Sequence, residues 1–294
     1  MIKNGVYAAS LSLLNNDKSL DINATINHAE SAIKKGLHGV FFFGSTGQSQ
    51  LISISEKKDL ISKSATSKFK DQFYFGTGVN SLKDNLDLIR YCIEFGYQTF
   101  LIMPPAYYKG NTDKGIYNFY AEIIAQVPKV KIILYNFEKL SGYLFSADAV
   151  TNLVKAFPKQ IIGCKDSSYN LFENLKIPNF KMFPGSEEKL LKGLELGCSG
   201  CISAVTNVTH SLARKVFDDF ENKKQQIMNE KLIKVRKIFD QYQLIPALHS
   251  FLSIDNKKYQ NILPPLTLLD SKSNEELLNQ LKKLDFTTST NIAA

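Results

Sequence analysis

The chain has 294 residues, of which 44% are apolar and 22% charged, and its formal net charge at pH 7 is +8. An apolar fraction of this size supports one large core and excludes an intrinsically disordered chain. The surplus of positive charge comes largely from lysine pairs spread along the sequence, such as Lys34-Lys35, Lys57-Lys58, Lys223-Lys224 and Lys257-Lys258. Because dispersed lysines without interleaved aromatic residues are typical of a solvated surface, we expect no nucleic-acid partner.

The sequence shows no targeting or membrane-spanning segment. Its first residues lack a basic region followed by an apolar stretch, and no apolar run reaches the roughly 18–20 residues of a membrane span. We therefore expect a cytoplasmic protein with no membrane partner. Four cysteines are too few for a disulfide framework in a chain of this length. Cys198 and Cys201 have metal-type spacing but no second pair, so we interpret them as small buried residues.

Short apolar segments alternate with amphipathic ones along the first two thirds of the chain. The predicted strands are Gly5–Ser10, Gly39–Phe43, Phe73–Gly76, Thr99–Met103, Lys131–Tyr135, Ile161–Lys165, Lys181–Phe183 and Gly200–Ser203. The predicted helices between them are Ile22–Lys35, Glu56–Phe69, Lys83–Phe95, Gly115–Val127, Ala147–Phe157 and Glu187–Leu196, with Ser55 and Ser81 as N-caps of the second and third. Continuous apolar strands are typical of a parallel sheet that is buried on both faces. Eight of them favour a closed (β/α)8 barrel of the α/β class over a doubly wound sheet, which usually has fewer strands.

The strand pattern stops after residue 204. The remaining apolar periodicity predicts helices over Leu212–Tyr242, Ile245–Leu252 and Asn274–Leu284. We expect residues 1–204 to carry the barrel strands and the active site. Residues 205–294 would hold the last barrel helix and a C-terminal helical extension, within the same structural unit.

Catalytic groups of such a barrel lie at the C-terminal ends of its strands, so the residues there are the candidates. The second predicted strand is followed by Gly44-Ser45-Thr46-Gly47. Two hydroxyl groups between glycines form a small cradle that suits a carboxylate. Taken alone, the same residues also suit an ordinary loop.

The fifth and sixth predicted strands end in Tyr135 and Lys165. Burial of a lysine favours its neutral amine, which is the nucleophile that attacks a ketone. A tyrosine on the neighbouring strand would carry the proton that imine formation and carbon–carbon cleavage both require. The alternative interpretation of Lys165 is a surface lysine at the end of its strand.

Metal and cofactor chemistry finds no support in the sequence. The four histidines, His28, His38, His210 and His249, show no metal-ligand spacing. There is no phosphate-binding P-loop and no dinucleotide-binding glycine motif. We therefore expect neither a metal nor a cofactor.

Three strand ends resemble, in order and spacing, the dihydrodipicolinate synthase / N-acetylneuraminate lyase family. These are Gly44-Ser45-Thr46-Gly47, Tyr135-Asn136 and Gly163-Cys164-Lys165-Asp166. The resemblance extends from Gly5 to about residue 255 and includes the stretches Pro104–Tyr108 and Gly200–Ser203. It implies a class I, pyruvate-dependent aldolase with a (β/α)8 barrel fold. Members of this family are usually tetramers made of two tight dimers.

The resemblance also implies a role for individual residues. Lys165 would form the imine with pyruvate and Tyr135 would shuttle protons, while Ser45 and Thr46 would bind the pyruvate carboxylate. Tyr107 would reach across the tight-dimer interface into the neighbouring site. Two further positions are implied to bind substrate, Gly185 in the loop Gly185-Ser186-Glu187-Glu188, and Ile202 beside the keto acid.

One departure from the family pattern bears on the substrate. Leu140 stands where the synthases carry an arginine that holds the carboxylate of aspartate semialdehyde, and Glu138 replaces a proline. An aliphatic side chain cannot make that contact, although Lys139 is a possible substitute. The acidic loop partly resembles the one with which sialic-acid lyases bind sugar hydroxyls, but Ala204 replaces a serine of those enzymes.

We therefore predict a lyase or aldolase for a 2-keto-3-deoxy sugar acid such as 2-keto-3-deoxygluconate. The alternatives are a dihydrodipicolinate synthase, an N-acetylneuraminate lyase, and a catalytically silent barrel that binds a keto acid.

Overall fold

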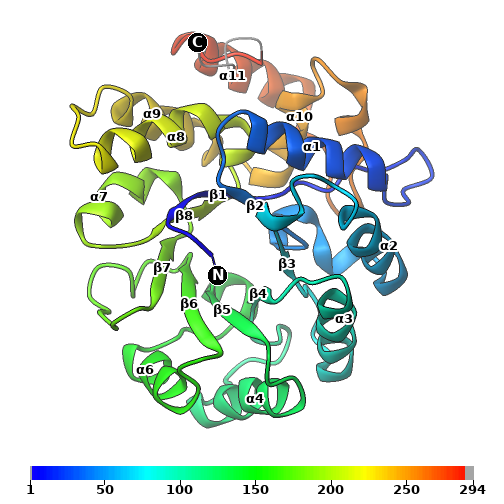
Figure 1. The fold of residues 1–294 in the computed structure, drawn as a ribbon. Helices are drawn as coiled ribbons and strands as arrows, with labels where there is room; N and C mark the ends of the chain where they lie inside the picture. The colour runs from blue at the N-terminus through cyan, green and yellow to red at the C-terminus, as the bar shows by residue number, and fades with distance from the viewer. Residues whose placement is uncertain (1, 289–294) are drawn as a thin grey trace.

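The computed structural model describes residues 2–288. Eight parallel strands form a ring with the helices outside it, as Figure 1 shows, and the predicted (β/α)8 barrel is confirmed. The strands are β1 (Gly5–Ala9), β2 (Gly39–Phe42), β3 (Phe73–Gly76), β4 (Thr99–Ile102), β5 (Lys131–Asn136), β6 (Ile161–Asp166), β7 (Lys181–Pro184) and β8 (Gly200–Ser203). Their hydrogen-bonded order is β7-β6-β5-β4-β3-β2-β1-β8, and β7 contacts β8 to complete the ring. Each strand end lies within one residue of its prediction.

Six of the helices between the strands follow the predicted order, and a short helix directly after β5 was not predicted. They are α1 (Ile22–Lys34), α2 (Ile54–Ser64), α3 (Leu82–Glu94), α4 (Asp113–Gln126), α5 (Glu138–Ser141), α6 (Ala147–Ala156) and α7 (Leu190–Glu195). Short 3-10 turns occur at η1 (Ser45–Gly47), η2 (Ser49–Leu51), η3 (Lys70–Gln72), η4 (Glu187–Lys189) and η5 (Lys257–Gln260). The predicted helix Glu187–Leu196 therefore begins as the turn η4 and continues as α7.

Helix α2 differs from its prediction at both ends. Its N-cap is Ser53 and not Ser55, because the Ser53 hydroxyl accepts from the backbone N–H of Glu56 while the Glu56 carboxylate accepts from the backbone N–H of Ser53. The helix stops at Ser64, well before the predicted end at Phe69. Hydroxyl groups there bond back to backbone carbonyls, as Ser64 does to Ile61, and end the regular pattern. Ser81 is the N-cap of α3, as predicted.

The helical extension packs on the barrel near β1. It consists of α8 (Thr206–Glu221), α9 (Asn229–Phe239), α10 (Leu244–Leu252) and α11 (Ser271–Lys282), and Figure 1 shows α9, α10 and α11 together on one side of the ring. The prediction of one helix over Leu212–Tyr242 is wrong, because the chain turns between α8 and α9 with Lys223 in a left-handed conformation (φ +54°). No described helix is long and apolar enough to cross a membrane.

Two apolar layers hold the barrel together. The larger layer lies between the strands and the surrounding helices. A second layer fills the ring itself with side chains from alternate positions of the strands, among them Tyr7, Phe41, Leu101, Ile133 and Phe183. Because Phe41 stacks on Tyr74 with ring centroids 5.0 Å apart, and Tyr7 packs edge-on against Phe183, the interior is a packed core and not a pore.

Candidate active site

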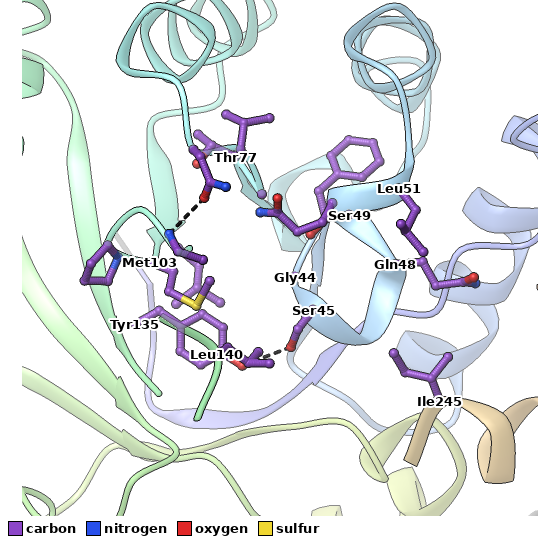
Figure 2. Close-up of a pocket in the computed structure, with 18 of the residues that line it drawn as sticks. Gly44, Ser45, Gln48, Ser49, Leu51, Thr77, Met103, Tyr135, Leu140 and Ile245 are labelled. Atoms are coloured by element: carbon purple, nitrogen blue, oxygen red, sulfur yellow. Dashed lines mark hydrogen bonds between the residues drawn. The ribbon is translucent and has the colours of Figure 1, made fainter. Parts of the chain in front are cut away.

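A cavity of about 350 Å³ opens at the C-terminal ends of the strands. Ser45, Thr77, Met103 and Tyr135 contribute to its wall from positions just after or at the ends of β2, β3, β4 and β5. Figure 2 shows these residues around the space, with Ile245 of α10 on the far side. The volume lies in the range of small-molecule sites, and the location is where barrel enzymes carry their chemistry.

Ser45, Tyr135 and Lys165 meet beside this cavity, as the sequence predicts for Tyr135 and Lys165. Tyr135 and Lys165 are paired in register on the neighbouring strands β5 and β6. The Lys165 Nζ atom lies over the Tyr135 ring, 4.2 Å from its centroid. The hydroxyl groups of Tyr135 and Ser45 are 3.0 Å apart, as the dashed line in Figure 2 marks. Lys165 is 3% exposed, so the interpretation as a surface lysine is wrong.

The second members of two motifs, Asn136 and Asp166, hold the strand ends in place. The Asn136 amide donates to the Asp166 carboxylate at 2.8 Å. The same carboxylate accepts from the backbone N–H groups of Tyr169, Leu171 and Phe172 at 2.8–2.9 Å. Both residues are fully buried. They therefore fix the loop after β6 and the neighbouring ends of β5 and β6, which carry Tyr135 and Lys165.

The predicted carboxylate cradle is the 3-10 turn η1, which follows β2. Thr46 is buried in this turn, while Ser45 is half-buried and faces Tyr135. Gly47 has no room for a side chain, because a Cβ atom there would lie 2.8 Å from the Ser10 carbonyl oxygen. The Gln48 side chain accepts from the backbone N–H of Leu263 at 2.7 Å, and its buried Nε2 atom has no partner among the described residues.

The outer part of the cavity is apolar and uncharged. Leu51, Leu140, Ile245 and Leu266 line it, and no Lys, Arg, Asp or Glu belongs to the lining in the described chain. The polar groups of the wall are uncharged hydroxyl and amide side chains, namely those of Ser45, Gln48, Ser49, Gln50, Thr77, Asn80 and Tyr135. Leu140 is 38% exposed at this rim, and Lys139 is exposed and does not line the cavity.

Three other predicted site residues, Tyr107, Gly185 and Ile202, do not line the cavity. Tyr107 is 81% exposed, has a positive φ of 85° and packs against the exposed Tyr108. Ile202 is fully buried inside the ring in the same cluster as Tyr135. Gly185 donates its N–H to the Asp166 carbonyl at 2.8 Å, and a Cβ atom at Gly185 would collide with the Ser167 hydroxyl.

Lys57 is a buried residue that the sequence interpretation placed on the surface. Its side chain runs beneath the cavity wall, and its Nζ atom donates to the carbonyls of Thr77 and Gly78 at 3.2 Å each. Burial lowers its pKa to about 8, while the charge of Asp84 acts in the opposite direction. The signal for this burial was present in the sequence, because Lys57 shares a helix face with Leu60 and Ile61.

The histidines and cysteines are structural. Burial lowers the pKa of His28 to about 4, and its ring bonds to the Tyr259 hydroxyl and the Asn207 side chain at 2.7 and 2.8 Å. All four cysteines are free and buried, which confirms the interpretation of Cys198 and Cys201. Among the described residues, no group of three or more His, Cys, Asp or Glu side chains is placed to hold a metal ion.

The model of the dihydrodipicolinate synthetase family matches residues 3–284. The chain belongs to this family. It is therefore a pyruvate-dependent carbon–carbon lyase of the aldolase type. A 4-hydroxy-tetrahydrodipicolinate synthase of Methanococcoides burtonii is 27% identical and covers 95% of this chain and 98% of its own.

Other family members resemble the chain to a similar degree. A 2-dehydro-3-deoxy-D-gluconate/2-dehydro-3-deoxy-phosphogluconate aldolase of Picrophilus torridus is 26% identical and covers 84% of this chain and 96% of its own. The solved 4-hydroxy-tetrahydrodipicolinate synthase of Methylacidiphilum fumariolicum has the same fold, with a TM-score of 0.88, 20% identity and coverage of 99% and 98%. Since synthase and aldolase relatives are about equally similar, the identities alone do not separate the two activities.

Proposed function

We propose that Lys165 forms a Schiff base with pyruvate and that the enzyme makes or breaks the bond between C3 of pyruvate and an aldehyde. The observation that carries this proposal is the position of Lys165, buried against the Tyr135 ring at a strand end beside the cavity. A silent keto-acid-binding barrel would not need a buried amine and a hydroxyl pair side by side. The turn that holds Ser45 and Thr46 would bind the pyruvate carboxylate, with Gly185 and Ile202 flanking the keto acid.

The same groups supply the proton transfers that the reaction needs. The Lys165 amine adds to the C2 ketone, and Tyr135 donates a proton to the departing hydroxyl, which leaves as water. In the cleavage direction the Tyr135 phenolate then takes the proton of the C4 hydroxyl. The C3–C4 bond breaks, the aldehyde leaves, and the electron pair passes into the imine to give an enamine. Protonation at C3 and hydrolysis release pyruvate and restore the lysine.

Borohydride trapping tests the Schiff base directly. Pyruvate with borohydride should add one reduced pyruvyl group at Lys165, because reduction fixes the imine to the lysine. Lys165→Arg keeps a long basic side chain but cannot form the imine, so it should abolish the adduct, whereas Lys181→Arg on the neighbouring strand should retain it. Intact-protein and peptide mass spectrometry decide the matter, and an adduct at another lysine would contradict the proposal.

As the compound that is cleaved we propose a 2-keto-3-deoxy sugar acid such as 2-keto-3-deoxygluconate, which gives pyruvate and a hydroxyaldehyde. The uncharged lining supports it, because the hydroxyl groups of a sugar acid can bond to Gln48, Ser49 or Thr77 without a positive partner. Aspartate semialdehyde adds a second carboxylate, and the aliphatic side chain of Leu140 cannot donate a hydrogen bond to it. The synthase and the sialic-acid lyase activities remain the alternatives.

We further propose that the enzyme is a cytoplasmic homotetramer. Tyr107 and Tyr108 are largely exposed in the single chain, on the loop beside the cavity. Two neighbouring exposed aromatic rings are typical of an interface, and a tight dimer would bring Tyr107 to the partner's site. Sedimentation equilibrium tests the assembly, with a mass of four subunits expected.

A further inference from the structure

A second buried polar cluster lies behind the ends of β7 and β8, outside the lining of the cavity. Its centre is the carboxylate of Glu187, which is fully buried. That carboxylate accepts from the hydroxyl of Ser203, from the hydroxyl of Thr209 at 2.9 Å and from the guanidinium of Arg236 at 3.0 Å. Arg236 is itself buried and donates at 2.9 Å to Ser203 and to Asp240. Four elements, η4, β8, α8 and α9, therefore meet at one carboxylate.

This arrangement keeps the carboxylate of Glu187 away from a substrate in the cavity. Three donors already occupy its two oxygens, and its side chain has no exposed surface. The resemblance of the acidic loop to that of the sialic-acid lyases therefore does not extend to a sugar-binding role for Glu187. Burying a charge of this kind is costly, and it is tolerated here because Arg236 neutralises it and hydrogen bonds satisfy both groups.

The cluster is joined to the residues proposed to flank the keto acid. Glu187 follows Gly185 by two positions, and the N–H of Gly185 bonds to Asp166, the residue after Lys165. Ser203 follows Ile202 directly on β8. The Glu187 carboxylate thus links the segment that carries Gly185 to the segment that carries Ile202, across two strands that share no ladder hydrogen bonds.

We propose that the Glu187–Arg236 pair is a positioning device of the pyruvate site, by which a helix of the C-terminal extension sets the place of Gly185 and Ile202. Glu187 is a positioning residue and not a catalytic one. The proposal rests on the proposed Schiff-base function. By this proposal the acidic loop contributes to the binding of pyruvate, because it holds Gly185 and Ile202 in place, and it does not bind the aldehyde.

The test measures borohydride trapping as a function of pyruvate concentration. In Glu187→Gln the half-saturating concentration of pyruvate should rise about tenfold, which is the effect of about 1.4 kcal/mol. The same factor should appear with every aldehyde partner, because the effect precedes the aldehyde. Glu230→Gln makes the same chemical change at an exposed residue of α9 and should leave trapping unchanged.

Two further variants keep the proposal falsifiable if Glu187→Gln does not fold. Glu187→Met/Arg236→Met removes both charges, and such apolar replacements often retain stability. Arg236→Lys retains the charge but cannot reach both Glu187 and Asp240. Any of the three that gives a wild-type circular dichroism spectrum should show the raised half-saturation, with the smallest rise in Arg236→Lys.

The outcomes separate this inference from the proposed function. Folded variants that trap pyruvate as the wild type does would overturn the positioning role. Normal trapping combined with a loss of sugar-acid cleavage alone would overturn it in favour of direct contact with the sugar. If the wild-type protein itself gives no adduct at Lys165, the proposed function is wrong, whatever the variants do.

Discussion

At the residue scale, the proposed sugar-acid substrate rests on Leu140, an apolar residue of the cavity lining that offers no charge to a second carboxylate. The variant Leu140→Arg places a guanidinium at the rim, where a charge-assisted hydrogen bond contributes about 1.5–3 kcal/mol. We expect the ratio of kcat/KM for aspartate semialdehyde to that for 2-keto-3-deoxygluconate to rise about ten- to hundredfold. Steady-state assays of pyruvate consumption and release measure both terms.

The control for this variant is Leu144→Arg. Leu144 is 41% exposed, similar to Leu140, but it does not line the cavity. The same added charge at Leu144 should leave the ratio unchanged. If the wild-type enzyme already condenses pyruvate with aspartate semialdehyde efficiently, a cation elsewhere binds the carboxylate. The proposed substrate is then wrong, while the Schiff-base chemistry stands.

The sequence points to the proposed catalytic residues, but it does not indicate the contacts that hold the site in place. Lys165 and Tyr135 stand out because each ends an apolar strand, where a polar group is out of place unless it has a function. Glu187 and Arg236 are 49 residues apart, and nothing local in either segment indicates that they pair. Such a contact depends on how α9 packs against the barrel. The apolar periodicity of a helix predicts its buried face but not the residues that this face contacts.

At the scale of elements, Lys57 joins helix α2 to the end of β3 through the carbonyls of Thr77 and Gly78. Its folded-state pKa of about 8 lies below the value of about 10.4 for an unfolded lysine. Between these values the unfolded chain holds more protons than the folded one, so stability should rise as pH rises. Below pH 8 the full cost of the buried charge remains, about 3 kcal/mol at ~1.36 kcal/mol per pKa unit.

The measurement is the free energy of unfolding in urea from pH 7.5 to 10.5. The difference between wild type and Lys57→Met should move in favour of the wild type across this range. Lys63→Met, at an exposed position of the same helix, should follow the wild-type profile. A constant difference between wild type and Lys57→Met would show that Lys57 keeps its ordinary pKa in the fold.

The elements themselves follow from local pattern wherever burial is regular. All eight strands match their predictions to within one residue, because nearly all of their residues are buried and most of the strands contain a short apolar run. The break between α8 and α9 was not predicted, since residues 222–226 are polar and an exposed helix could have the same sequence. Likewise the N-cap at Ser53 depends on the reciprocal bond from Glu56, which three serines in close succession leave ambiguous.

At the scale of the whole molecule, the C-terminal helical extension contributes to the site together with the barrel. The helical extension contacts the barrel at the cavity as well as behind it, through Ile245 and Leu266 in the lining and through Arg236 at Glu187. The extension is therefore part of the site. The strand pattern of the sequence does not indicate this, because the last strand comes before the extension begins.

The packed interior of the ring has a consequence for the order of events during turnover. Tyr7, Phe41 and Phe183 fill the space within the ring. We therefore expect molecules to enter and leave only at the C-terminal ends of the strands, where the cavity opens. Exposure falls from 38% at Leu140 to 3% at Lys165, so the proposed imine would lie at the inner, closed end of this passage. The aldehyde must then leave before pyruvate. In the cleavage direction pyruvate should inhibit competitively against the sugar acid and the aldehyde noncompetitively, and the reverse pattern would mean that a second exit opens during the cycle.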